Sequence, residues 1–115
     1  MDDSEPEDVL ELIADDYTRV FLAHMSRQRM SAKELTEIVD ASERTVYRRL
    51  EQLQSFDLIS EELEIDQQGH HRKRYRATFR KLIVEIDGEG YEIRLQIEED
   101  TADRFARMWN DIRGT

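Results

Sequence analysis

The chain contains no cysteine among its 115 residues. This excludes disulfide bonds, thiol catalysis and zinc sites built on cysteine ligands. No apolar run approaches the roughly 18 residues that indicate a membrane-spanning helix. The acidic N-terminus also lacks the positive flank and apolar run of a secretory signal. We therefore expect one cytoplasmic domain that has no membrane partner.

Lysine is scarce as well: only Lys33, Lys73 and Lys81 are lysines, against 14 arginines. Acidic residues are abundant, and the formal net charge is −10. Many acids with few lysines resemble the proteomes of extreme halophiles. In such proteins an acidic surface is a solubility adaptation and says little about the partner.

The charges are segregated along the chain. Residues 1–16 carry eight acids and no base, whereas residues 67–81 carry six bases and no acid. With Arg44, Arg48 and Arg49, nine of the 17 bases fall in two short stretches. This segregation predicts a local anion-binding surface on an acidic body.

The basic stretch with Arg44, Arg48 and Arg49 is predicted to form an amphipathic helix that Ser42 caps. Its apolar residues share one helical face: Val46, Leu50 and Leu53. Arg44 and Arg48 lie about 160° and 200° from Val46, on the opposite side. Such a helix suits a DNA major groove, although a surface helix with solvated arginines has the same pattern.

The segments around this helix favour the DNA interpretation. Upstream, Ser31 and Glu34 form a capping box, and a short break at residues 40–42 separates two helices, as in a helix-turn-helix or any αα-hairpin. Downstream, residues 60–66 alternate like a half-buried strand, and a basic strand returns over residues 72–78. Two helices followed by this hairpin have the order of a winged helix.

The two ends of the chain predict further elements. Residues 8–28 have the spacing of one long helix, and residues 79–97 predict a second hairpin with its turn at 87–90. A terminal helix is expected to carry a stripe of small and aromatic residues: Ala102, Phe105, Ala106, Trp109 and Ile112. This stripe fits packing on its own hairpin, or a homodimer interface formed with the first helix.

The stretch from Met30 to Ile59 reads MSAKELTEIVDASERTVYRRLEQLQSFDLI. It resembles the winged helix-turn-helix core of ArsR-like transcriptional regulators, and especially the short forms of halophilic archaea. The resemblance covers Ser31–Leu35, the helix from Ser42 to Leu50, and Leu58–Ile59. It implies a dimeric DNA-binding regulator. Metal sensors of the family carry a cysteine motif on the recognition helix, so that property does not transfer to this chain.

Together these observations predict an α+β fold: a winged helix-turn-helix with a three-helix core and a β-hairpin wing, then a C-terminal β-hairpin and a terminal helix. Residues 1–78 are expected to form the DNA-binding part. Residues 79–115 are expected to be an extension of the same domain that serves dimerisation.

The predicted function is sequence-specific binding of double-stranded DNA in transcription regulation, by a homodimer. The candidate DNA-binding residues are Ser31, Lys33, Ser42, Arg44, Thr45, Tyr47, Arg48, Arg49, His70, His71, Arg72, Lys73 and Arg74. Ser42 could be only a cap, and Arg49 could pair with an acid. The alternative function is a winged helix that binds proteins of the transcription machinery.

No catalytic site is predicted, because the sequence shows no nucleophile–base pair, phosphate-binding loop or paired-carboxylate site. No cofactor or metal is expected either. The adjacent His70 and His71 would point to opposite faces of an extended tip, which is poor geometry for one ion.

Overall fold

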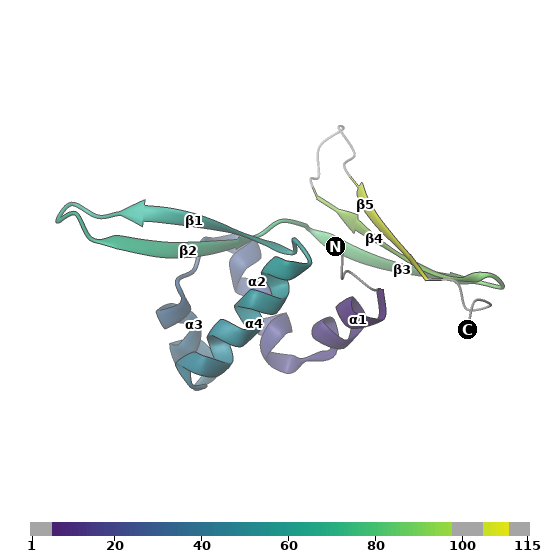
Figure 1. Cartoon of the computed structure of the whole chain (residues 1–115), viewed down its shortest axis with the longest axis horizontal. Coiled ribbons are helices and arrows are strands. Elements are labelled where there is room, and N and C mark those ends of the chain that lie inside the picture. The colour runs from purple at the N-terminus through teal and green to yellow at the C-terminus, as the bar shows by residue number, and fades with distance from the viewer. Residues whose placement is uncertain (1–5, 98–104, 111–115) are drawn as a thin grey trace.

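The computed structural model describes residues 6–97 and the strand at 105–110, and it has an α+β fold (Figure 1). Its elements in chain order are α1 (Pro6–Ala14), α2 (Asp16–Arg27), α3 (Ala32–Val39), α4 (Glu43–Ser55), β1 (Ile59–Ile65), β2 (His71–Ala77), β3 (Lys81–Asp87), β4 (Gly90–Gln96) and β5 (Phe105–Asn110). Helices and hairpins form an elongated molecule with extents of 56 × 35 × 27 Å.

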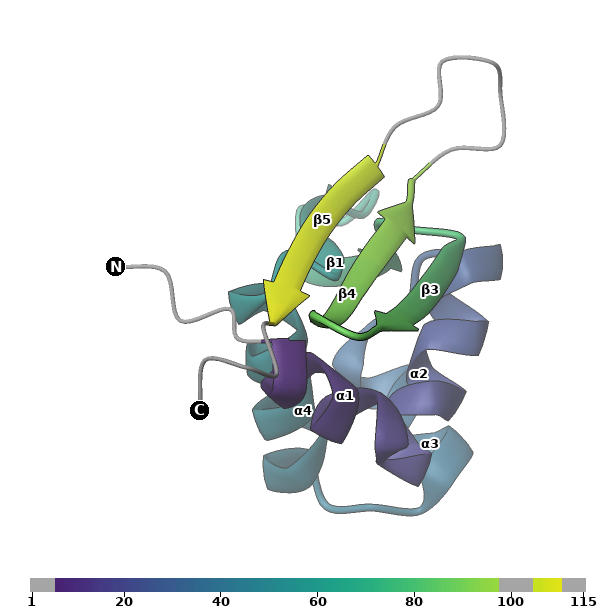
Figure 2. The same ribbon diagram turned by 90° about the vertical axis from the view of Figure 1, so that its right-hand side faces the viewer.

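The strands make two separate antiparallel sheets, β1-β2 and β3-β4-β5. The β1–β2 hairpin extends past the helices at one end of the molecule, and the three-stranded sheet lies at the other (Figure 1). Figure 2 shows this second sheet from its open side, with β3 and β5 at its two edges and α1 beneath it. The candidate DNA-binding helix α4 therefore lies in the helical body between two β structures.

The core forms where the helices meet the first hairpin. The apolar stripe of α4 is buried as predicted, with Val46, Leu50 and Leu53 each at most 1% exposed. Phe21 of α2 and Leu35 of α3 are fully buried in the same cluster. Burial of this stripe fixes which side of α4 faces solvent.

Both predicted helix starts are confirmed. Ser31 and Glu34 form the capping box, and the Ser42 hydroxyl accepts a hydrogen bond from the Thr45 amide at 3.1 Å. Between the two helices Asp40 adopts a left-handed conformation with φ of 54°, which turns the chain sharply. The predicted hairpins are also present, with turns between β1 and β2 and between β3 and β4.

The prediction of one continuous helix over residues 8–28 was wrong. Asp15 is extended, with ψ of 130°, and separates α1 from α2. Its carboxylate accepts hydrogen bonds from the amide and the hydroxyl of Thr18, at 2.9 and 3.1 Å. The acid that fitted a helical pattern therefore serves as the N-cap of a new helix.

The predicted terminal helix was also wrong over the residues described. Residues 105–110 form β5, which pairs antiparallel with β4 so that Met108 lies opposite Ile93 and Ala106 opposite Leu95. An edge of β4 that would otherwise lack a partner is thereby paired, and this tertiary pairing overrides the helical spacing. Ala102 and Ile112, which completed the predicted stripe, lie outside the described residues.

None of the helices in the described part of the chain is long or apolar enough to span a bilayer. The longest, α4, has 13 residues, whereas about 20 are needed.

The burial of Leu50 leads to a stability prediction. Leu50→Ala should lower the free energy of unfolding by about 2–5 kcal/mol, because it leaves a cavity under α4. Chemical denaturation followed by circular dichroism measures this. Gln52→Ala, on the exposed side of the same helix, should change it by less than about 0.5 kcal/mol. Equal effects of the two substitutions would contradict the assigned orientation of α4.

Candidate nucleic-acid interface

The outer face of α4 carries the residues that sequence analysis placed in the DNA major groove. Arg44, Tyr47 and Arg48 are all exposed, and Tyr47 retains 49% of its accessible surface. Within residues 6–97, no hydrogen bond or ion pair engages the guanidinium group of Arg44 or Arg48. Both groups are therefore available to an anionic partner.

The start of α4 is held by its own side chains. The Ser42 hydroxyl caps the helix and also donates to the Thr45 hydroxyl at 3.1 Å. Ser42 is exposed and Thr45 is half-buried, so both oxygens lie near the surface at the helix N-terminus. Amides and hydroxyls at this position can meet a phosphate without reading sequence.

Arg49 does not belong to this outer face. Its Nε and Nη2 atoms donate to the two carboxylate oxygens of Asp15, each at 3.0 Å. The hydrogen bond from Arg49 is the main reason that the pKa of Asp15 is lowered. The structure thus confirms the alternative in which Arg49 pairs with an acid. The adjoining groove is also lined by Asp8 and Glu11, which would repel a phosphate.

Ser31 and Lys33 differ in accessibility. Ser31 is 3% exposed, and both its backbone amide and its hydroxyl are used in the capping box with Glu34. The hydrogen bond from the Ser31 amide is the main reason that the pKa of Glu34 is lowered. Lys33 is exposed on the outer side of α3. Of the two, only Lys33 has a side chain free to reach a backbone phosphate.

Arg74 of β2 links the hairpin to the helices. Its Nε atom lies 3.0 Å from Glu64, and its Nη1 atom lies 3.3 Å from Glu34 and 3.1 Å from the carbonyl oxygen of Arg29. The Arg74 side chain is only 17% exposed. These contacts make Arg74 a structural residue at the base of the hairpin.

Two further cations of the hairpin face acids on β1, whereas Arg76 lies opposite Ser60. Arg72 lies 3.4 Å from Glu64, and Lys73 lies 3.8 Å from Glu61. The Nδ1 atom of His70 lies 3.2 Å from Asp66 across the turn. The segment Ile59–Ala77 holds four acids and four arginines or lysines. The expected basic return strand is present as β2, but the three acids of β1 together with Asp66 of the turn balance its charge.

The two faces of the hairpin differ in chemistry. Cross-strand register places Leu63 opposite Lys73 and Ile65 opposite His71 on the face that includes buried Tyr75. Leu63 and Ile65 are 59% and 60% exposed, because this part of the hairpin extends beyond the helical body. An apolar pair flanked by a lysine and a histidine therefore lies open to solvent.

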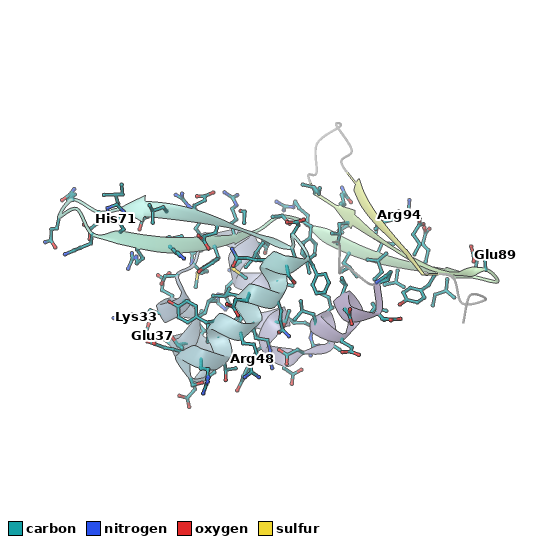
Figure 3. All side chains as sticks on the ribbon, in the orientation of Figure 1. Lys33, Glu37, Arg48, His71, Glu89 and Arg94 are labelled. Carbon is teal, nitrogen blue, oxygen red and sulfur yellow. The ribbon has the colours of Figure 1, made fainter. Side chains whose placement is uncertain are left out.

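Tyr75 connects this face to α4. Burial is the main reason that the pKa of Tyr75 is raised, and the nearby Glu61 and Tyr47 of α4 raise it further. Figure 3 shows that Lys33, Arg48 and His71 lie in the half of the molecule away from Glu89 and Arg94, although they come from α3, α4 and β2. These three exposed candidates thus lie on the side of the molecule away from the three-stranded sheet.

Sequence reasoning missed three residues that organise this region: Asp15, Arg29 and Glu62. Arg29 donates to Glu62 at 2.7 Å and fastens β1 to the segment before α3. The position of the hairpin turn sets Glu62 opposite Arg74 and Glu64 opposite Arg72. The turn could therefore have placed Glu62 on the hairpin, but not beside Arg29. The pairing of Asp15 with Arg49, 34 residues apart, has no local signal.

Within the described residues, no group of three or more histidine, aspartate or glutamate side chains could hold a metal ion. No protein-family model and no curated protein matches the chain.

The Asp15–Arg49 pair leads to a pH-dependent prediction. Because the folded pKa of Asp15 is depressed, the pair stabilises the fold above the unfolded pKa of about 3.9, and this stability is lost as pH falls through the folded pKa. Asp15→Asn keeps a capping oxygen but removes the charge, and should cost about 1 kcal/mol at pH 7.

Denaturation of both proteins between pH 7 and pH 3 measures this, and the difference between them should shrink below about pH 4. Asp16→Asn is the control, because the Asp16 side chain is 87% exposed and should show a smaller effect at every pH. An unchanged difference at pH 3 would rule out the ion pair as its source.

Proposed function

We propose that this protein is a sequence-specific DNA-binding transcriptional regulator of winged helix-turn-helix type, related to ArsR-like regulators. In this proposal α3 and α4 form the helix-turn-helix, and the β1–β2 hairpin is the wing. The observation that carries the proposal is the pair of exposed arginines, Arg44 and Arg48, on a capped helix whose other face is locked into the core.

The geometry of α4 supports major-groove insertion. The groove accepts an α-helix, and a guanidinium group can donate two hydrogen bonds to guanine O6 and N7. Neither Arg44 nor Arg48 would have to break an ion pair with the described residues to do so. Tyr47, on the same face, can contact a thymine methyl group or a phosphate. We assign base recognition to these three residues.

Backbone contacts fall to residues around this helix. Ser42 and Thr45 lie at its N-terminus, and Lys33 is exposed on α3. On the wing, His70, His71, Arg72 and Lys73 are the candidates for the phosphate backbone or the minor groove. Ser31, Arg49 and Arg74 serve instead as supports, since their polar groups are already engaged.

The acidic balance of the protein shapes how it would bind. Arg72 and Lys73 must exchange Glu64 and Glu61 for phosphates, so each contributes less than an unpaired cation would. In concentrated salt, counterion release contributes little to affinity. We expect a shallower salt dependence than that of a basic repressor.

A second function, protein binding by the same winged helix, is favoured by a specific observation. The wing has as many acids as arginines and lysines, and it exposes Leu63 and Ile65. Apolar side chains on a neutral hairpin suit a protein partner in the transcription machinery. In either case we propose that the protein acts in the cytoplasm as a homodimer.

A mobility-shift assay separates the two functions. The regulator should bind DNA from upstream of its own gene more tightly than random DNA of equal length. Failure to bind either DNA, by folded protein, would contradict DNA recognition and favour the protein-binding function.

The base-reading assignment makes a prediction for Arg48. Arg48→Ala should lower discrimination at one base pair by about 1–3 kcal/mol, because a bidentate contact to guanine is lost. Binding to a panel of single-base operator variants measures this. Arg27→Ala is the control, since Arg27 is exposed at the end of α2 and is not a candidate DNA contact. Unchanged affinity and preference in Arg48→Ala would refute the groove assignment.

The wing assignment predicts the opposite pattern. Arg72→Ala and Lys73→Ala should weaken binding to all sequences alike and lower the salt slope by up to about 0.9 each. Glu61→Gln should strengthen binding to all sequences, because it frees Lys73 from its carboxylate partner. Titrations at several salt concentrations test this; a sequence-dependent effect of Glu61→Gln would contradict a backbone role.

A further inference from the structure

The strand β3 has an unpaired edge of unusual composition. In the sheet order β3-β4-β5, β3 pairs only with β4, so its outer edge has no partner strand among the described residues. Val84 and Ile86 on this strand are 39% and 75% exposed. Among the described residues, Ile86 is the most exposed large hydrophobic side chain. Exposed apolar edge strands are templates for pairing with another chain.

The sequence of β3 is self-complementary in the antiparallel sense. It reads KLIVEID from Lys81 to Asp87. If two copies pair about a two-fold axis through Val84, Lys81 of each lies opposite Asp87 of the other. In the same register Leu82 lies opposite Ile86, and the two Val84 side chains meet. Opposite charges and apolar pairs in these positions stabilise a sheet.

Other registers are less favourable. An axis at Glu85 would set the two Glu85 carboxylates against each other, and an axis at Ile83 would set Asp87 opposite Phe79. A one-residue slip would place the apolar face of one strand beside the polar face of the other. Only the axis at Val84 pairs the whole of β3 with Lys81 opposite Asp87. The remaining pair sets Ile83 opposite Glu85, whose carboxylate keeps its ion pair with Arg94 of its own chain at 2.7 Å.

A groove beside β3 fits the same arrangement. It has a volume of about 280 Å³ and is lined mainly by apolar residues of α2 and of the segment leading into β3, including Leu22, Ala23, Phe79 and Leu82. Leu82 shares a sheet face with Val84 and Ile86, because these residues alternate along the strand. In the paired register, the partner's Ile86 would lie against Leu82 at this groove.

We propose that two copies of this chain associate through antiparallel pairing of their β3 edges about Val84, forming one continuous six-stranded sheet. A two-fold axis makes this interface isologous, so the same surface serves both copies. The proposal specifies the interface of the homodimer named in the proposed function, but it requires no DNA.

The test is sedimentation of the full chain without DNA. The unmodified protein should sediment as a dimer. Val84→Lys should raise the dimer dissociation constant by about tenfold or more, because it sets two like charges against each other at the axis. Val20→Lys is the matched control: Val20 on α2 is 37% exposed, close to the 39% of Val84, and its substitution should leave the dimer intact.

A covalent test uses the absence of cysteine. Val84→Cys introduces the only thiol of the chain, and antiparallel pairing at the axis would bring the two Cα atoms within disulfide range. Mild oxidation should cross-link Val84→Cys rapidly and Val20→Cys slowly.

Three outcomes would overturn the proposal: a monomeric unmodified chain, a folded Val84→Lys variant that still dimerises, or equal cross-linking of the two cysteine variants. A dimer disrupted by Val20→Lys alone would place the interface on the helices instead. Since none of these measurements includes DNA, their failure is distinct from failure of the DNA-binding function.

Discussion

Burial of one face of α4 is the constraint on which the rest of the structure depends. Val46, Leu50 and Leu53 are removed from water in the core cluster, where α4 contacts α3 and β1. Because residues three and four apart share a helical face, this burial leaves Arg44 and Arg48 on the solvent side. The caps at Ser31 and Ser42 and the left-handed Asp40 set where α4 begins. A core interaction thus determines which side chains can meet a partner.

Ion pairs separate Arg49 and Arg74 from the two outer arginines of α4. Arg49 and Arg74 are partly buried, at 23% and 17% exposed, and hold helices and hairpin together through Asp15, Glu34 and Glu64. Arg44 and Arg48 make no such contacts with the described residues. In a chain with 27 acids, a guanidinium group left uncommitted is a more specific signal for an anionic partner than the total charge is.

Local patterns predicted most of the helical body and both hairpins, because capping and periodicity act over a few residues. The capping box at Ser31 and the stripe around Leu50 are of this kind. Long-range interactions account for the failures. The split at Asp15 accompanies its pairing with Arg49, 34 residues away, and β5 forms by pairing with β4. The ion pairs of the β1–β2 hairpin likewise depend on the cross-strand register, which composition alone does not give.

The central claim is that the exposed arginines of α4 read DNA sequence. Genome-wide DNA occupancy of the unmodified protein, compared with a double Arg44→Ala and Arg48→Ala variant, tests it most directly. The unmodified protein should occupy discrete sites that share a short motif with two-fold symmetry, and the variant should lose those sites while its fold persists. Occupancy without a shared motif, or the same sites in both proteins, would contradict it.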